Sequence, residues 1–157
     1  MLTAIFGLLG VVIGGLITAS STYMVEERRA RREETKERRE RVMELKRAAR
    51  LVDEDIQWAL SAVTLTINSK RWTQEPLQLK TWQEYRGLFA SETTLGNWRI
   101  LKAAARVMLT YNFTLTKLSE VSKWEIDKVD LDFLEGEKTT LQKARDALKP
   151  FVDLRAE

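Results

Sequence analysis

The sequence predicts an all-α protein, in which a single N-terminal transmembrane helix continues into a charged stalk helix and then an antiparallel helical bundle. Three observations predict this class. Residues 1–25 contain no charged side chain, whereas residues 26–50 contain eleven Lys/Arg and seven Asp/Glu. From residue 42 onward, apolar residues recur at helical spacings of three and four. Only 7 Gly and 2 Pro occur in 157 residues, which leaves few of the turns that a sheet protein needs.

Residues 1–25 form the predicted transmembrane helix. Residues 2–25 read LTAIFGLLGVVIGGLITASSTYMV, and a helix of this length would extend roughly 36 Å, enough for a hydrocarbon core of ~30 Å. A cleavable signal peptide would carry a positive segment before the apolar run, and no Lys or Arg precedes it here. Because the basic residues follow the span, the positive-inside rule predicts a single-pass protein of the inner (plasma) membrane. Its N-terminus would lie outside and its C-terminus in the cytoplasm.

Small residues share one face of the predicted span. The set comprises Thr3, Gly7, Gly10, Gly14 and Ser21. Gly10 and Gly14 have the small-xxx-small spacing that allows two transmembrane helices to approach closely. We therefore expect this face to support a homo-oligomer; the alternative is that it faces lipid.

Residues 26–41, EERRARREETKERRER, form the predicted stalk helix. Ala30 is the only apolar residue among them, so this helix has no face to bury. Acid-first pairs at i,i+4 spacing would stabilise it: Glu27–Arg31, Glu34–Arg38 and Glu37–Arg41. The first basic residues, Arg28, Arg29, Arg31 and Arg32, are the candidates for contact with lipid headgroups. Nucleic acid is an unlikely partner, because the basic excess is confined to this stretch.

Residues 42–152 form the predicted cytoplasmic bundle, followed by a tail over residues 153–157. The first helix carries an apolar stripe with coiled-coil spacing, made of Val42, Leu45, Ala49, Val52, Ile56, Val63 and Ile67. This stripe could pair with another chain as a coiled coil or pack within a bundle. We favour the bundle, because the remaining chain supplies further amphipathic helices.

Three further helices follow a loop over residues 68–80. A short helix is expected from Trp82 to about Ala90, with Thr81 as its cap and Glu84 completing a capping box. A long helix is expected from about Leu95, and its apolar stripe includes Asn112. We interpret Asn112 as a hydrogen-bonded core residue; the alternative is a binding residue. The last helix is expected from a cap at Asp130 to Lys149, with Pro150 ending it. Residues 119–129 are either a turn or a helix continuation.

Four segments carry a resemblance to other proteins. These are the Gly-rich run GLLGVVIGG, the charged run ERRARREETKERRER, and the paired segments WQEYRGLFA and LGNWRILKAA. Together they resemble a class of uncharacterised bacterial and phage single-span membrane proteins. The resemblance implies a Gly-rich N-terminal span, an Arg/Glu-rich juxtamembrane helix and a cytoplasmic helical bundle. It implies no particular activity.

The composition makes an enzyme improbable. The chain has no Cys and no His, which excludes thiol nucleophiles, His-based triads and Cys/His metal sites. Asp53, Glu54 and Asp55 are adjacent carboxylates, but consecutive residues of a helix cannot share one face, so solvation explains them more simply. We expect no catalytic residue, cofactor or metal. The favoured function is a membrane-anchored interaction or scaffold module with an unknown protein partner. The alternative is a small oligomeric pore or membrane-perturbing protein of holin-like or effector-like type.

Overall fold

The described part of the chain is all-helical. In the computed structural model, backbone is described for residues 2–121 and 124–153, and side chains for residues 23–120 and 124–153. Four helices and no strand occur in these ranges: α1 (Leu2–Ser69), α2 (Lys80–Glu92), α3 (Leu95–Val121) and α4 (Lys128–Val152). The chain divides into two units between Arg41 and Val42. The predicted all-α class is therefore confirmed.

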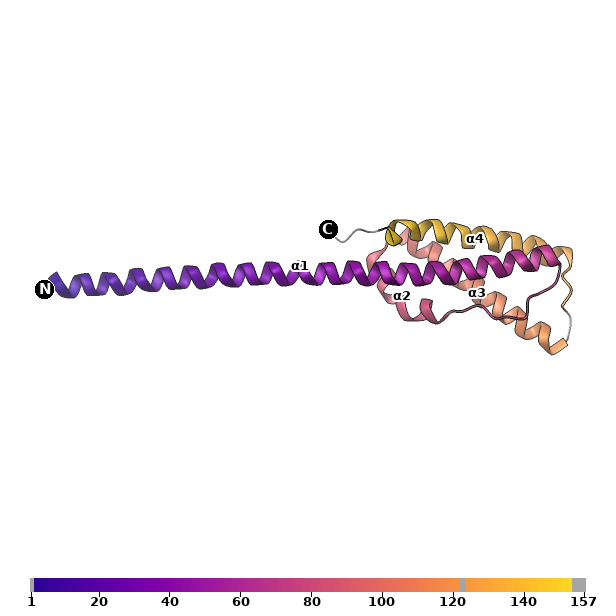
Figure 1. The fold of residues 1–157 in the computed structure, drawn as a ribbon, viewed down its shortest axis with the longest axis horizontal. Coiled ribbons are helices and arrows are strands. Elements are labelled where there is room, and N and C mark those ends of the chain that lie inside the picture. Colours follow the sequence, from indigo (N-terminus) through magenta and orange to yellow (C-terminus); the bar gives the residue numbers. More distant parts are fainter. Residues whose placement is uncertain (1, 122–123, 154–157) are drawn as a thin grey trace. The chain divides into compact units, whose positions relative to one another are not determined.

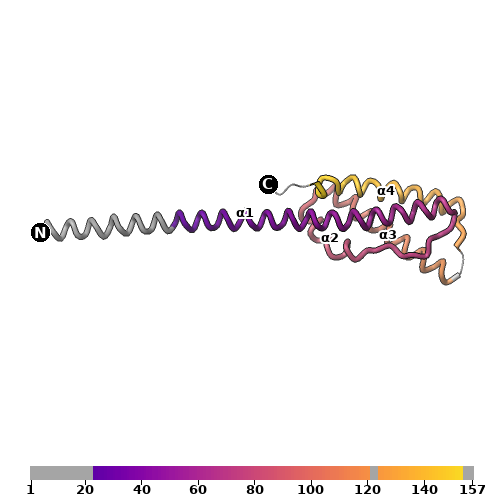
Figure 2. The backbone as a smooth tube through the Cα atoms, in the orientation of Figure 1, coloured from indigo at the N-terminus to yellow at the C-terminus, as the bar shows by residue number. Residues whose placement is uncertain are grey.

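The transmembrane prediction falls largely on residues that are not described. Among the described residues, no helix is long and apolar enough to cross a bilayer. The predicted span covers residues 1–25, and the side chains of residues 1–22 lie outside the described part, drawn in grey in Figure 2. The small-residue face from Thr3 to Ser21 lies there too.

The second unit is a bundle whose core is shared by all four helices. From α1 the core takes Leu45, Ala49, Val52, Ile56, Ala59, Val63 and Thr66, an unbroken alternation of four and three. The expected stripe differs at its ends: Val42 is only half-buried, Ile67 packs on the edge of the core, and the fully buried residue at that end is Thr66. Apolar stripes of α3 and α4, centred on Leu101, Met108, Leu134 and Leu141, pack against this helix.

The helix directions differ from the simple antiparallel bundle. Val52 and Ile56 lie beside Leu101 to Met108 of α3, and further along α1 Thr66 lies beside Tyr111, so α1 and α3 run the same way. Helix α4 runs opposite to both (Figure 1). The reason is the connection over residues 70–79, which carries the chain back along the bundle before α2 begins.

Polar anchors hold this connection on the bundle. The side chain of Asn112 accepts a hydrogen bond from the backbone N–H of Leu77 (2.7 Å) and donates to its carbonyl (2.9 Å). Asn112 is therefore confirmed as a hydrogen-bonded residue that fixes packing. The Tyr111 hydroxyl contacts the hydroxyls of Thr66 (2.8 Å) and Thr73 (2.6 Å), joining α1, α3 and the connection.

The connection between α3 and α4 is tied to the same end of the bundle. Residues 124–127 are not helical, and Glu125 forms an isolated antiparallel bridge with Arg71. The backbone N–H of Trp72 donates to the backbone carbonyl of Trp124 at 2.9 Å. Of the two expectations for residues 119–129, the structure therefore has a helix ending at Val121 and a connection after it.

Helix boundaries correct three predictions. Helix α2 begins at Lys80, so Thr81 lies inside its first turn instead of capping it, and Leu79 at the cap position makes no side-chain cap hydrogen bond. The cap of α4 is Asp127, and Asp130 is the third residue of its capping box. Pro150 lies inside α4, which continues to Val152. Proline costs one backbone hydrogen bond there, and Phe151 and Val152 offset this loss by packing on the core.

Candidate interaction surface

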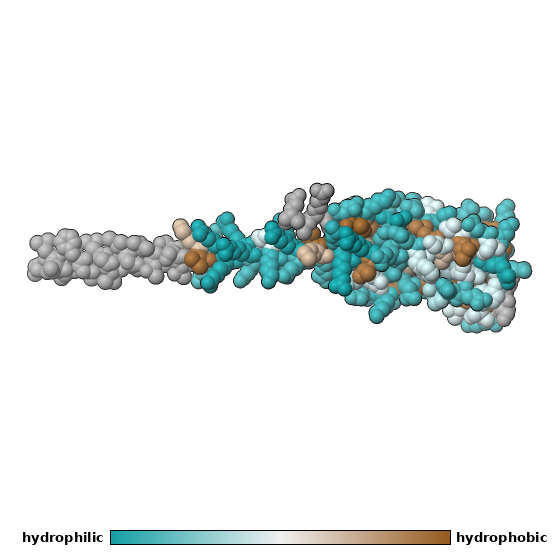
Figure 3. All heavy atoms as spheres, viewed as in Figure 1, coloured by the Kyte–Doolittle hydropathy of each residue, from teal (hydrophilic) through white to brown (hydrophobic). Residues whose placement is uncertain are grey.

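The charged segment before the bundle is solvent-exposed throughout. Every residue from Tyr23 to Arg41 is exposed, and the surface of this segment is predominantly hydrophilic (Figure 3). The four candidate lipid-contact residues, Arg28, Arg29, Arg31 and Arg32, are thus accessible, and Arg28, Arg31 and Arg32 share one face of the helix.

Ion pairing within this segment follows the predicted spacing only in part. Arg31 pairs with Glu27 at 2.6 Å, as predicted, and Lys36 pairs with Glu40 at 3.8 Å. The predicted pairs Glu34–Arg38 and Glu37–Arg41 do not form. Exposed pairs contribute only a few tenths of a kcal/mol each, so they stabilise the helix slightly and leave its surface free for other charges.

An apolar face of α1 remains open to solvent on the bundle. Trp58 is 51% exposed and Leu65 is 59% exposed, although both are large apolar side chains. They lie seven residues apart, so they share one side of the helix, with Ser61 and Ala62 between them. We call these four residues the Trp58–Leu65 face.

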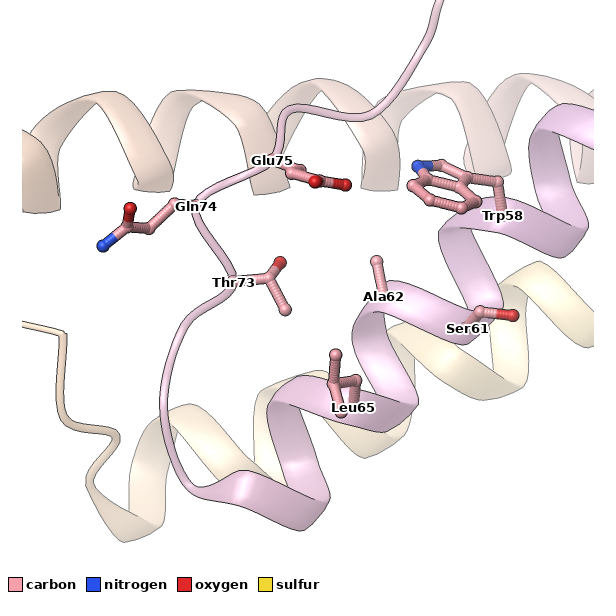
Figure 4. A pocket seen from close by; sticks show the side chains of 7 residues that line it. All are labelled: Trp58, Ser61, Ala62, Leu65, Thr73, Gln74 and Glu75. Carbon is pink, nitrogen blue, oxygen red and sulfur yellow. The ribbon is translucent and has the colours of Figure 1, made fainter.

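Two shallow grooves flank this face. The first, about 440 Å³, lies between α1 and the connection, as Figure 4 shows. The α1 side of this groove is formed by Trp58, Ser61, Ala62 and Leu65, and the other side by Thr73, Gln74 and Glu75. The second, about 460 Å³, lies between α1 and α4, where Lys138 and Gln142 line it. Ser61 and Leu65 border both grooves, so they form a ridge between them.

Hydroxyl groups along this face already have partners within the chain. Ser61 donates to the carbonyl of Gln57 at 3.0 Å, and Thr73 contacts the Tyr111 hydroxyl. The ridge therefore presents mainly apolar surface to a partner. Charged groups occur only on its two flanks, with Glu75 on one side and Lys138 on the other.

The sequence interpretation missed this face, because all five Trp residues were expected in the core or between helices. Trp72 is buried against Tyr111 with ring centroids 5.3 Å apart, and Trp82 stacks on Trp98 at 5.5 Å, as expected. Trp58 is the exception. Trp58 falls outside the spacing of four and three residues that places Ile56 and Ala59 in the core. This spacing could have predicted that Trp58 is exposed.

Two of the three adjacent carboxylates, Asp53 and Asp55, face other helices. Asp53 accepts a hydrogen bond from Arg145 of α4 at 3.2 Å, and Asp55 faces Thr81 of α2. Burial raises the pKa of the Asp55 carboxyl; the hydrogen bond to Thr81 opposes this rise, and the nearby Glu54 charge adds to it. The three residues do not share a face, as predicted, but solvation accounts for Glu54 alone. No group of three or more acidic residues within the described ranges is arranged to hold a metal ion.

Comparison with known proteins yields no relative. No protein-family model, no curated protein and no solved structure matches this chain. Function must therefore be argued from the chain's own residues.

Proposed function

We propose that this protein is a membrane-anchored helical interaction module. Residues 1–25 cross the inner membrane, residues 26–41 form a stalk, and the bundle from Val42 binds a partner in the cytoplasm. One observation carries this proposal: a charge-free segment of membrane-spanning length adjoins a helix that is polar and exposed on every side. Such a helix has no apolar face to pack, which suits a spacer between a bilayer and a folded domain.

The bundle supports the interaction part of the proposal. Its core is closed by four helices, and most of its polar anchors join one helix or connection to another. The Trp58–Leu65 face exposes two large apolar side chains next to open grooves. Exposed apolar surface of this kind is typical of protein-binding sites.

Two secondary contacts belong to the same proposal. The small-residue face Thr3, Gly7, Gly10, Gly14 and Ser21 would pair the spans of two copies. The basic residues Arg28, Arg29, Arg31 and Arg32 would lie beside anionic headgroups, where each contributes about 1 kcal/mol before the interspersed acids reduce the attraction.

Protease access in intact cells tests the anchor and its orientation. A tag at the C-terminus should resist external protease and be degraded once the cells are opened, because all the juxtamembrane basic residues follow the span. A tag at the N-terminus should show the opposite sensitivity. Cleavage of the C-terminal tag in intact cells would reverse the proposed orientation.

The span pairing has its own test. Gly10→Ile and Gly14→Ile should each weaken association in a transmembrane reporter assay, because a bulky side chain separates the two backbones, while membrane insertion persists. Unchanged association in both variants would mean that this face meets lipid. Loss of association together with loss of dye leakage would favour the pore function instead.

A further inference from the structure

The spacing of apolar residues along the Trp58–Leu65 face suits packing against the same face of a second copy of this chain. Leu51, half-buried, precedes Trp58 by seven residues, and Leu65 follows it by seven. When two helices pack in parallel and in register, residues at seven-residue intervals meet their own counterparts. The ridge at Ser61 and Leu65 lies between two grooves, so the ridge of each copy can pack into a groove of the other.

Charge on the two flanks selects the orientation of the copies. Glu75 borders the groove on one side of the ridge, Lys138 borders the groove on the other, and neither forms an ion pair within the described chain. A two-fold axis parallel to α1 brings the Glu75 flank of each copy against the Lys138 flank of the other. A two-fold axis perpendicular to α1 would instead place Glu75 against Glu75 and Lys138 against Lys138. Complementary charge therefore favours the parallel pair.

We propose that the cytoplasmic bundle pairs with a second copy of itself through the Trp58–Leu65 face, with the two α1 segments parallel and Glu75 of each copy opposite Lys138 of the other. The proposal deepens the membrane-anchored function and rests on it. Residues 58–65 extend only about 12 Å along a helix about 10 Å wide, so the contact is much smaller than a standard interface of ~800 Å² per partner. Two copies held in one membrane gain the effective concentration that a contact of this size needs.

Charge exchange in the full-length chain in native membranes is the decisive test. Ser61→Cys provides the readout, because the chain has no other Cys and the Ser61 hydroxyl bonds only to its own helix. Under mild oxidation it should give a disulfide-linked dimer. Adding Glu75→Lys or Lys138→Glu should each lower the dimer yield by about tenfold, since each turns two symmetry-related attractions into repulsions. Combining both changes should restore the yield.

A foreign partner or an antiparallel pair would respond differently. The doubly exchanged chain would still present reversed charge to a foreign partner, and like charges would still face each other in an antiparallel pair. Failure of the combined variant to recover, or an unchanged yield in the single variants, would therefore overturn the proposal.

A second position checks the parallel register. Leu65→Cys should also crosslink to itself, whereas Lys102→Cys, on the exposed side of α3, should not. An antiparallel pair centred on residue 61 would separate the two copies of residue 65 by about 12 Å along the helix, beyond the ~7 Å that a disulfide can join. Crosslinking at Ser61→Cys alone, or equally at Lys102→Cys, would contradict the parallel pair.

The same samples separate this inference from the proposed function. Chains that pellet with membranes but do not crosslink at residues 61 and 65 would refute the pairing and leave the anchored module intact. Chains that crosslink as expected but remain in the supernatant would support the pairing and refute the anchor.

Discussion

Replacing Asn112 with Ala should destabilise the bundle measurably without changing its fold. The Asn112 amide makes two hydrogen bonds to the backbone of Leu77, and these attach the connection between α1 and α2 to helix α3. Each hydrogen bond contributes about 0.5–1.5 kcal/mol net, so the loss is about 2 kcal/mol. Ala is the better helix former by about 0.5 kcal/mol. The expected decrease in the free energy of unfolding is therefore about 1.5 kcal/mol.

Urea unfolding of the full chain, followed by Trp fluorescence, measures this change. All five Trp lie between residues 58 and 124, so the signal reports the bundle alone. With a urea dependence of about 1.5 kcal/mol/M, the midpoint should fall by about 1 M. Asn68→Ala is the matched control, because Asn68 is exposed near the end of α1, and its midpoint should stay within about 0.3 M of wild type. A shift for Asn112→Ala no larger than the control's would refute the anchoring role.

The remaining predictions use the same unfolding assay. Leu141→Ala should cost about 2–5 kcal/mol, because Leu141 is completely buried, while Leu109→Ala, at a 54% exposed position, should cost less than about 0.5 kcal/mol; equal losses would contradict the assigned core. Lys70→Gly should stabilise by about 0.5–1 kcal/mol, because Lys70 directly follows the last residue of α1 with a φ of 53°, which glycine adopts without strain; a loss of stability would show that the side chain matters more. Asp55→Asn should be at least as stable as wild type at neutral pH. Its advantage should shrink as the pH falls through the raised pKa of Asp55 towards the unfolded value of 3.8, because the folded wild type then binds the proton that burial favours; a constant difference would contradict the raised pKa.

Periodicity predicted the helices well, because burial of apolar faces determines where long helices form. A break before Leu95 and the two long helices that follow it were predicted from the pattern, although α2 runs two residues further than expected, to Glu92. Helix ends were predicted less well. Thr81 has the spacing of a cap, yet α2 begins one residue earlier, at Lys80, which places Thr81 inside the helix.

Hydrophobic periodicity also did not predict the directions of the helices or the exposed Trp58–Leu65 face. A connection of ten residues is long enough either to turn back at once or to cross the bundle. The choice depends on tertiary contacts such as Trp72 against Tyr111 and Asn112 against Leu77. Trp58 was expected to be buried because large aromatic residues usually are. Its exposure follows from the register of α1, which the neighbours Ile56 and Ala59 set by occupying the core.

Alkaline carbonate extraction of membranes from cells that express the chain tests the central claim most directly. The full-length protein should remain in the membrane pellet, because a span without charged residues is held by the hydrocarbon core and not by surface charge. A chain that starts at Val42 should appear in the supernatant with a helical circular dichroism spectrum, since the bundle unit has its own core. Release of the full-length protein into the carbonate supernatant would contradict the anchored module.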